Sequence, residues 1–247
     1  MDLQNKTALV TGSTRGIGKA IAQLLCERGA SVYLNSFKSI KEGIILEKEL
    51  RLRGFDVTYL QGDISEKKDI QKILKIIYKQ KRRLDILVNN AGIYKKSRSI
   101  NSIMYAHYED FHRVNGWGVY LTTLLASKLM KKGKVINISS IYGIDPNPLS
   151  ILASGVKSEV VNYTLAFAKL FMGKIEVNSI APGYTDTSLL HKDIPKNQLV
   201  SIINCMPQKK LIQPEEIAQA VVFLLENDGV TGQILVVDGG YTLSQRS

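Results

Sequence analysis

Short apolar runs alternate along the chain with longer stretches in which apolar residues recur every three or four positions. The longer stretches have the period of a helix with one buried face, and the short runs have the length of buried strands. Strands separated by helices require crossover connections, which produce a mainly parallel sheet. The seven runs that predict strands are Thr7–Val10, Ser31–Asn35, Val57–Leu60, Leu84–Val88, Val135–Ile138, Ile175–Ile180 and Ile234–Val237. The pattern therefore predicts an α/β fold, a doubly wound seven-stranded sheet with helices on both faces.

Helices are predicted between these strands. Apolar positions within Ile17–Leu25 form one face of the first helix, and Gly29 follows as a stop signal. The spacing also predicts a helix over Glu42–Arg53, which Gly54 ends, and an amphipathic helix around Ile70–Ile77.

The composition fits one folded domain over residues 1–247. Apolar residues make up 45% of the chain, enough for a sizeable core. No apolar run approaches the length of a membrane span, and the first residues lack the pattern of a signal peptide. Cys26 and Cys205 lie in apolar surroundings and predict buried thiols in a reducing, cytoplasmic compartment. The three histidines have no zinc-binding spacing, so no metal site is predicted.

The chain is strongly basic, with a formal net charge of +11. Basic runs such as KQKRR at Lys79–Arg83 could attract nucleic acid, anionic lipid or an acidic carrier protein. These runs do not interleave with aromatic residues or form a known nucleic-acid motif. A solvated lysine-rich surface is therefore the preferred interpretation, and nucleic-acid binding, which would depend strongly on salt, is the weaker alternative.

A glycine-rich segment joins the first predicted strand to the first predicted helix. It reads VTGSTRGIG over Val10–Gly18. Its glycines allow a tight turn and let a diphosphate approach the backbone, and the helix start offers free N–H groups and a positive dipole end. The spacing differs from the commoner G-x-G-x-x-G, but its place between a strand and an amphipathic helix favours a dinucleotide site over a structural turn. The residues expected to contact the cofactor here are Gly12, Ser13, Thr14, Arg15, Gly16, Ile17 and Gly18.

Further motifs follow in order over nearly the whole chain. They are GDI with Asp63, NNAG at Asn89–Gly92, Asn115, INISS at Ile136–Ser140, Lys157, APG at Ala181–Gly183 and VDGG at Val237–Gly240. With the glycine loop, this series resembles the short-chain dehydrogenase/reductases, and within them the 3-oxoacyl-(acyl carrier protein) reductase-like group. The resemblance implies a Rossmann-type fold and NAD(P)-dependent reduction of a carbonyl or oxidation of an alcohol, with 3-oxoacyl thioester-like compounds among the candidate substrates.

The end of the second predicted strand bears on the choice between NADP(H) and NAD(H). In such folds an acidic residue there binds the ribose 2′-hydroxyl of NAD, whereas a 2′-phosphate requires positive charge. The strand ends in Asn35 and Ser36, with no Asp or Glu nearby, and Lys38 follows. Arg15 in the glycine loop could also reach the phosphate. The sequence therefore favours NADP(H) over NAD(H).

The resemblance implies more cofactor contacts after the later strands. Asp63 would accept a hydrogen bond from the adenine amino group with help from the Ile64 backbone, although capping of the next helix is an alternative role for Asp63. Gly92 would let the backbone pass close to the ribose, and Asn89 would tether neighbouring strands. The other expected contacts are Ala91 and, near the nicotinamide amide and the diphosphate, Pro182, Gly183, Thr185 and Thr187.

The same resemblance implies a catalytic set. In the family a tyrosine is the general acid, a lysine four residues later binds the ribose and lowers the tyrosine pKa, a serine positions the carbonyl oxygen, and an asparagine anchors a water chain. Asn115, Ser140 and Lys157 match three of these positions. The tyrosine position holds Ala153, and no shift of alignment brings a tyrosine there without losing the spacing from serine to lysine.

The missing tyrosine leaves three interpretations. In the first, the protein reduces carbonyls with a proton from elsewhere, either from Tyr142 or from a water at the vacated position. In the second, it binds NADP(H) without catalysis, as a sensor or partner subunit. In the third, it is a variant inactivated on purpose. Loss of a general acid typically costs about 10²–10⁴-fold in rate, so hydride transfer can persist, and the first interpretation is preferred.

Assembly and substrate are predicted only in outline. The resemblance implies a homotetramer or homodimer that acts on a small carbonyl or alcohol, with the predicted long helices Tyr105–Met130 and Ser150–Phe171 at interfaces. Residues 186–212 interrupt the alternation with polar and turn residues, which indicates a substrate lid or else a surface loop. Apolar residues in that segment suggest an apolar cleft, namely Leu189, Leu190, Ile194, Leu199 and Ile202.

Overall fold

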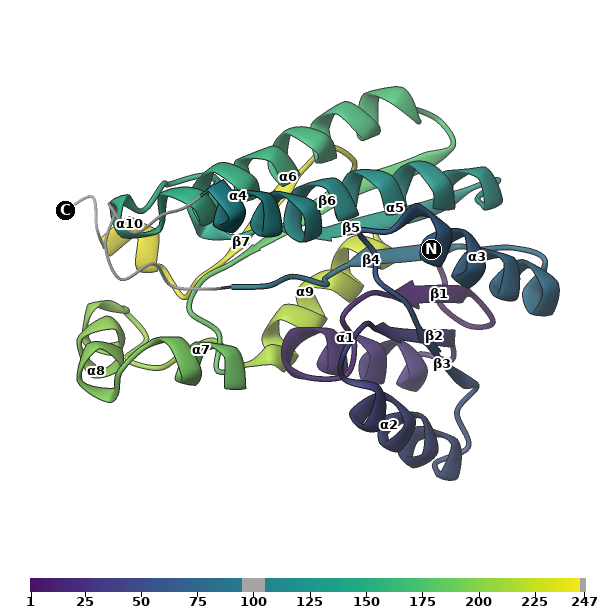
Figure 1. Cartoon of the computed structure of the whole chain (residues 1–247), viewed down its shortest axis with the longest axis horizontal. Coiled ribbons are helices and arrows are strands. Elements are labelled where there is room, and N and C mark those ends of the chain that lie inside the picture. The colour runs from purple at the N-terminus through teal and green to yellow at the C-terminus, as the bar shows by residue number, and fades with distance from the viewer. Residues whose placement is uncertain (95–104, 245–247) are drawn as a thin grey trace.

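The computed structural model describes residues 1–94 and 105–244, whose strands form one seven-stranded parallel sheet with helices on both faces (Figure 1). The strand order is β3-β2-β1-β4-β5-β6-β7. The strands are β1 Thr7–Val10, β2 Ser31–Ser36, β3 Val57–Gln61, β4 Ile86–Asn89, β5 Gly133–Ile138, β6 Ile175–Pro182 and β7 Ile234–Val237. The predicted fold class is confirmed. Some strand ends differ from the prediction because ladder pairing continues through polar residues, such as Ser36 with Gln61 and Asn89 with Asn137.

Helices connect the strands, as the apolar spacing predicted. They are α1 Gly16–Glu27, α2 Ile40–Leu52, α3 Lys67–Lys81, α4 Tyr105–Phe111, α5 Gly118–Ala126, α6 Ile151–Leu170, α7 Ser188–Asp193, α8 Lys196–Cys205, α9 Pro214–Glu226 and α10 Tyr241–Ser244. Four short segments complete the description, η2 His112–Trp117, η3 Ser127–Leu129, η4 Ile141–Gly143 and η5 Pro148–Ser150. Gly29 and Gly54 follow α1 and α2 with φ of +80° and +87°, so both predicted stop signals are confirmed.

Both faces of the sheet are covered. Successive strand residues point to opposite faces, so Val10 packs with α1 and α9 on one side, while Leu9 packs with α3, α5 and α6 on the other. Figure 1 shows α5 and α6 above the sheet and α1 and α2 below it. Burial on both faces explains why the strands read as apolar runs with little polar alternation.

The strand order reverses between β1 and β4. From β1 the sheet grows through β2 and β3 in one direction, and from β4 through β7 in the other. The loops that leave the carboxyl ends of these two strands therefore diverge and open a crevice, which is where α/β sheets bind ligands. The two loops come very close, because a Cβ on Gly12 would lie 2.6 Å from the Cα of Ala91.

The predicted long helix over Tyr105–Met130 contains a π-helical turn. α4 continues into η2, a π-helix, and then into α5 and the 3₁₀ turn η3. A π turn widens the helix and shifts backbone groups from their usual partners, and such turns are frequent at functional sites. Here the turn contains Asn115.

The segment over residues 186–212 holds two helices, α7 and α8, which the sequence pattern did not predict. Thr187 caps α7 by accepting a hydrogen bond from the Leu190 N–H at 3.3 Å. A bridge between Thr185 and Ile212 brings the two ends of the segment together. Figure 1 shows α7 and α8 beyond the carboxyl ends of the strands.

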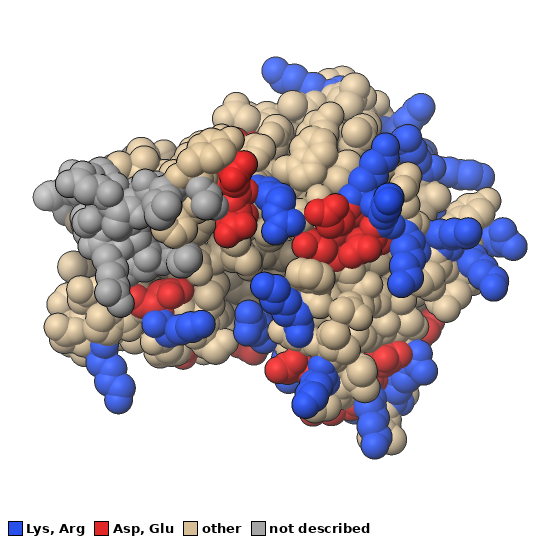
Figure 2. Space-filling view, in the orientation of Figure 1, with Lys and Arg blue, Asp and Glu red and all other residues tan. Residues whose placement is uncertain are grey.

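The surface and the helices bear on three further expectations. Cys26 is buried, and burial raises its thiol pKa to about 12, but Cys205 is exposed at the end of α8, so the prediction of two buried thiols was wrong for Cys205. Lys and Arg side chains are spread over the face in Figure 2, with acidic side chains between them. None of the helices in the described ranges is long and apolar enough to cross a membrane.

Candidate functional site

A cleft of about 560 Å³ lies at the reversal of strand order. The segments that follow β1 to β6 contribute to its walls, together with η2, α6 and α7. The predicted site residues that line it are Gly12, Thr14, Arg15, Gly16, Ile17, Gly18, Asn35, Ser36, Lys38, Asp63, Ile64, Ala91, Gly92, Asn115, Ser140, Tyr142, Ala153, Lys157, Pro182, Gly183, Thr185 and Thr187. Ser13 and Asn89 are buried behind the wall and support it. Residues far apart in the sequence thus meet in one cleft.

The start of α1 has the features of an anion site. Arg15 is the N-cap residue, in extended conformation, and its side chain does not cap the helix. The first N–H groups of a helix have no acceptor within the helix. With the positive end of the helix dipole, these groups suit a diphosphate. Gly12 and Gly16 have φ of +61° and +52°, which keeps the turn tight and its surface free of side chains.

Asn90 braces this turn from the loop after β4. Its side-chain amide donates to the Thr11 and Gly12 carbonyls at 3.0 and 2.9 Å. A Cβ on Gly18 would lie 2.4 Å from the Gly12 oxygen, so α1 can approach the turn only with glycine there. Asn90 was not among the predicted site residues, although its place as the second asparagine of NNAG could have indicated a role.

The polar side chains at the end of β2 form hydrogen bonds with other groups of the protein. The Asn35 amide donates to the carbonyls of Leu60 and Gly62, each at 3.1 Å. The Ser36 hydroxyl donates to the Ser39 carbonyl and shares a bond of 2.9 Å with the Tyr59 hydroxyl. The Ser13 hydroxyl accepts from the Asn35 N–H at 2.9 Å. Asn35, Ser36 and Ser13 therefore hold β2, β3 and the glycine loop in register.

Two cations face the cleft beside these residues. Arg15 and Lys38 line it and are solvent-exposed, and neither forms an ion pair with a described carboxylate. The Lys38 ammonium lies 5.9 Å from the centre of the Phe37 ring. This corner of the cleft carries positive charge that the fold itself does not neutralise.

Asp63 marks the end of the cleft near β3. Its carboxylate accepts from the N–H and hydroxyl of Ser65 at 2.9 and 2.6 Å, while the N-cap of α3 is Glu66, so Asp63 does not cap that helix. Arg113 on η2 donates to the Ser65 hydroxyl at 2.8 Å and lies 3.6 Å from the Asp63 carboxylate. Arg113 lines the cleft and was not identified from sequence, because no local motif marks it.

Asn89 ties strands and helices beneath the cleft. Its amide donates to Asn137 on β5 at 2.8 Å and to Thr123 on α5 at 2.9 Å. The Asn137 amide in turn donates to Thr164 on α6 at 2.9 Å. These buried bonds fix β4 and β5 against the two helices, as predicted for a tethering asparagine.

Asn115 fixes the other side of the loop after β4. Its side-chain oxygen accepts from the Ile93 N–H, and its amide donates to the Ile93 carbonyl, both at 2.8 Å. A Cβ on Gly92 would lie 2.9 Å from that side-chain oxygen, so this approach favours glycine. Asn115 therefore joins the π turn to the cleft wall.

Ser140 and Lys157 come together because η4 packs against α6. The Ser158 hydroxyl donates to the Gly143 carbonyl at 3.1 Å, and a Cβ on Gly143 would lie 2.7 Å from the Lys157 carbonyl oxygen. The Ser140 oxygen accepts from the Tyr142 N–H at 3.2 Å, so its own hydroxyl proton is available to the cleft.

Lys157 is held in the cleft without a carboxylate partner in the described part of the chain. Its ammonium nitrogen donates to the Ile138 carbonyl at 2.7 Å. Burial lowers the pKa of Lys157 to about 8. A buried ammonium with donor capacity to spare suits a neutral polar ligand group such as a pair of ribose hydroxyls.

Ala153 lies one helical turn before Lys157 and lines the same wall. Tyrosines from other elements line the cleft too, Tyr94 after β4, Tyr142 on η4 and Tyr184 after β6. Tyr184 was not identified from sequence. From the segment over residues 186–212, Leu189, Leu190 and Ile194 line the cleft, whereas Leu199 and Ile202 pack into the core with α1 and α9.

Known proteins resemble this chain over nearly its full length. A family model described as enoyl-(acyl carrier protein) reductase matches residues 12–242. A 3-oxoacyl-[acyl-carrier-protein] reductase of Synechocystis sp. is 32% identical, with 98% of both chains covered. The corresponding reductase of Thermotoga maritima is 29% identical, covering 98% of this chain and all of the relative.

Among solved structures, a short-chain dehydrogenase from Burkholderia cenocepacia in complex with NADP superposes with a TM-score of 0.91. It is 26% identical, and 98% of this chain and 100% of that chain are covered. The order of motifs, the sheet topology and these matches agree. The chain belongs to the short-chain dehydrogenase/reductase family of nicotinamide-dependent oxidoreductases.

Proposed function

We propose that this protein reduces a carbonyl compound with NADPH, or oxidises the matching alcohol with NADP⁺. The observation that carries the proposal is the uncapped start of α1 in the same cleft as Ser140 and Lys157. When bound, the nicotinamide supplies or accepts a hydride. The Ser140 hydroxyl donates to the carbonyl oxygen, and the Lys157 ammonium donates to ribose hydroxyls. Asn115 keeps the cleft wall and the π turn in place.

The preference for a 2′-phosphate follows from the charges at the end of β2. Arg15 and Lys38 are exposed there, and Asn35 and Ser36 are committed to protein partners. A 2′-phosphate would satisfy both cations, whereas a bare 2′-hydroxyl would leave them without a partner. The NADP complex of the Burkholderia relative agrees with this preference.

The substrate class in this proposal is a ketone with an apolar arm, and 3-oxoacyl thioesters are the first candidates. Tyr94, Leu189 and Ile194, which line the cleft, would contact such an arm, and two of the relatives above are 3-oxoacyl-[acyl-carrier-protein] reductases. We also propose that the chain is a single domain in which residues 186–212 form a substrate lid. The protein is proposed to be cytoplasmic and to assemble as a homotetramer.

A second candidate function rests on Ala153. A methyl group cannot donate a proton, so a protein that binds NADP(H) without turnover, as a sensor or subunit, would have the same cleft. The experiment that separates the two measures NADPH affinity by cofactor fluorescence and then NADPH consumption with a panel of ketones and 3-oxoacyl thioesters. Turnover that Ser140→Ala removes supports the reductase. Tight binding with no turnover on any compound supports the second function.

A further inference from the structure

Two tyrosines form a hydrogen-bonded pair in the wall of the cleft. The hydroxyl oxygens of Tyr142 and Tyr184 are 2.7 Å apart. Their rings meet edge to face with centroids 6.3 Å apart, and Tyr184 makes a second edge-to-face contact with Tyr241. Contacts on both sides fix the orientation of Tyr184, and the shared bond fixes Tyr142.

The hydrogen bonds at this pair leave one proton for the cleft. The Asn147 amide donates to the Tyr142 hydroxyl at 3.1 Å. When Tyr184 also donates, the Tyr142 oxygen accepts two hydrogen bonds, and its own O–H is free to reach a third atom. Burial raises the pKa of both phenols, so both are protonated near neutral pH and act as donors.

Both tyrosines line the cleft together with the groups that would bind the substrate oxygen, and Tyr142 is close to one of them in the chain. Tyr142 is two residues from Ser140, and its N–H binds the Ser140 oxygen. η4, which carries Tyr142, packs against α6 next to Lys157 through Gly143. Tyr142, Ser140, Ala153 and Lys157 all line the cleft. Tyr142 therefore contributes a phenol to the same cleft to which α6 contributes Lys157 and, at position 153, only a methyl group.

We propose that Tyr142 protonates the substrate oxygen in this chain and that Tyr184 positions it; the inference rests on the proposed reductase function. The carbonyl carbon receives a hydride from a dihydronicotinamide, the C=O electron pair shifts to oxygen, and this oxygen takes the Tyr142 proton. The resulting Tyr142 phenolate accepts hydrogen bonds from Tyr184 and Asn147 and takes a proton from solvent water when the cleft opens. Alcohol oxidation runs through the same steps in reverse.

The test is a double-mutant cycle with Ala153→Tyr. The assay uses a ketone that Ala153→Tyr reduces, so that the choice of substrate does not limit the result. In the wild-type background Tyr142→Phe should lower kcat by about 10²-fold or more. In the Ala153→Tyr background the same change should lower kcat by about threefold or less, because the introduced phenol then donates the proton.

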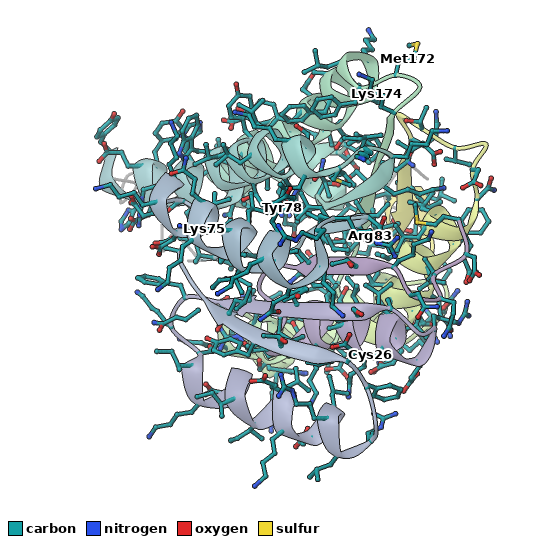
Figure 3. All side chains as sticks on the ribbon, turned by 90° about the vertical axis from the view of Figure 1, so that its right-hand side faces the viewer. Cys26, Lys75, Tyr78, Arg83, Met172 and Lys174 are labelled. Atoms are coloured by element: carbon teal, nitrogen blue, oxygen red, sulfur yellow. The ribbon has the colours of Figure 1, made fainter. Side chains whose placement is uncertain are left out.

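Tyr184→Phe tests the supporting role. It should lower kcat by about tenfold in the wild-type background, since one hydrogen bond to the donor is lost, and should have little effect in the Ala153→Tyr background. Tyr78→Phe is the matched control, because Tyr78 lies on the outer surface of α3 (Figure 3) and does not line the cleft. NADPH affinity, measured by cofactor fluorescence, should be the same in all these variants.

Three results would overturn the inference. One is a Tyr142→Phe protein as active as the wild type. Another is an equal loss in both backgrounds, which would indicate that Tyr142 only supports the loop. The third is a wild-type protein that binds NADPH and reduces nothing that Ala153→Tyr reduces. Absence of NADPH binding in every variant would instead refute the proposed function itself.

Discussion

At the scale of single residues, the central feature is a lysine whose charge is poorly compensated. Burial lowers the pKa of Lys157 to about 8, and its polar contact within the described protein is the Ile138 carbonyl. Burying this ammonium in its charged form therefore lowers the stability of the fold. Residues placed in this way are typical of sites that bind a ligand, because the ligand restores the missing interactions.

This cost predicts a pH dependence of stability. Between pH of about 8 and 10.5 the unfolded chain keeps the Lys157 proton and the folded protein does not, so the free energy of unfolding rises with pH across this window. Across this window the free energy of unfolding of the wild type should increase by up to about 3 kcal/mol relative to that of Lys157→Met. Below pH of about 8 the difference between the two proteins should not change with pH. Urea unfolding at several pH values measures this.

The control for that series is Lys174→Met, which removes an exposed lysine (Figure 3). A stability difference between wild type and Lys157→Met that does not change with pH would contradict the burial of this ammonium.

The cations at the end of β2 predict cofactor selectivity. Arg15→Ala and Lys38→Ala should each weaken NADPH binding by about ten- to a hundredfold, the worth of a charge-assisted hydrogen bond, and leave NADH binding nearly unchanged. Lys41→Ala, an exposed lysine on α2, removes the same charge and should have little effect. Equal loss for NADPH and NADH in the Arg15 variant would show that no 2′-phosphate contact exists. Calorimetric titration with both cofactors makes the measurement.

Several site residues could not be predicted from their own sequence neighbourhood. Asn115, Ser140 and Lys157 were found because they belong to ordered motifs. Arg113 has no such mark and reaches the cleft through the π turn, whereas Tyr184 stands between two predicted site residues but its role depends on a partner on another element. Ser13 and Asn89 differ from these residues, because they belong to clear motifs and were expected to contact the cofactor, yet their side chains form hydrogen bonds within the protein.

At the scale of elements, the glycine loop is built on a close approach of two backbones. A Cβ on Gly12 would meet the Ala91 backbone at 2.6 Å, and the residue also has positive φ. Gly54 has a φ of +87°, but a Cβ there would meet nothing within 4 Å, so Gly54 has only the conformational requirement. Comparing substitutions at Gly12 and Gly54 therefore separates the effect of a positive φ from the effect of a steric clash.

Gly54→Ala should cost about 1 kcal/mol of unfolding free energy and leave cofactor binding intact. Gly12→Ala should cost more and abolish NADPH binding, because the loop after β1 must move away from the loop after β4. Thermal unfolding and NADPH fluorescence on both variants test this. Normal NADPH affinity in Gly12→Ala would contradict the assigned role of the loop.

The elements also show what apolar periodicity can predict. The strands β1 to β6 and the main helices follow from it because they bury apolar residues, whereas β7 is an apolar edge strand without a fully buried residue. The π turn at Asn115 does not change the apolar spacing, so the pattern could not predict it. α7 and α8 are short, and α7 has no fully buried residue, so they also left little apolar signal.

At the scale of the whole molecule, exposed apolar side chains on α4 to α6 favour self-association. Trp117 and Leu165 are each 40% exposed and Leu170 is 67% exposed. Large apolar groups of this kind are common at subunit contacts. Leu52 on α2 is even more exposed, at 79%, but lies on a different face and provides a comparison.

The predicted homotetramer makes this testable. Leu165→Glu should shift the protein to dimers or monomers in analytical ultracentrifugation, because a buried carboxylate at a subunit contact costs several kcal/mol unless it is paired. Leu52→Glu introduces the same charge and should leave the assembly unchanged. A wild-type protein that sediments as a monomer at every concentration would refute the predicted assembly.

The central claim is that a nicotinamide dinucleotide binds where the strand order reverses. Calorimetric titration of the purified protein with NADPH, NADP⁺, NADH and NAD⁺ tests this most directly. We expect one site per chain, with the phosphorylated cofactors bound at least about tenfold more tightly than the others. No heat with any of the four, and no competition among them, would contradict the claim.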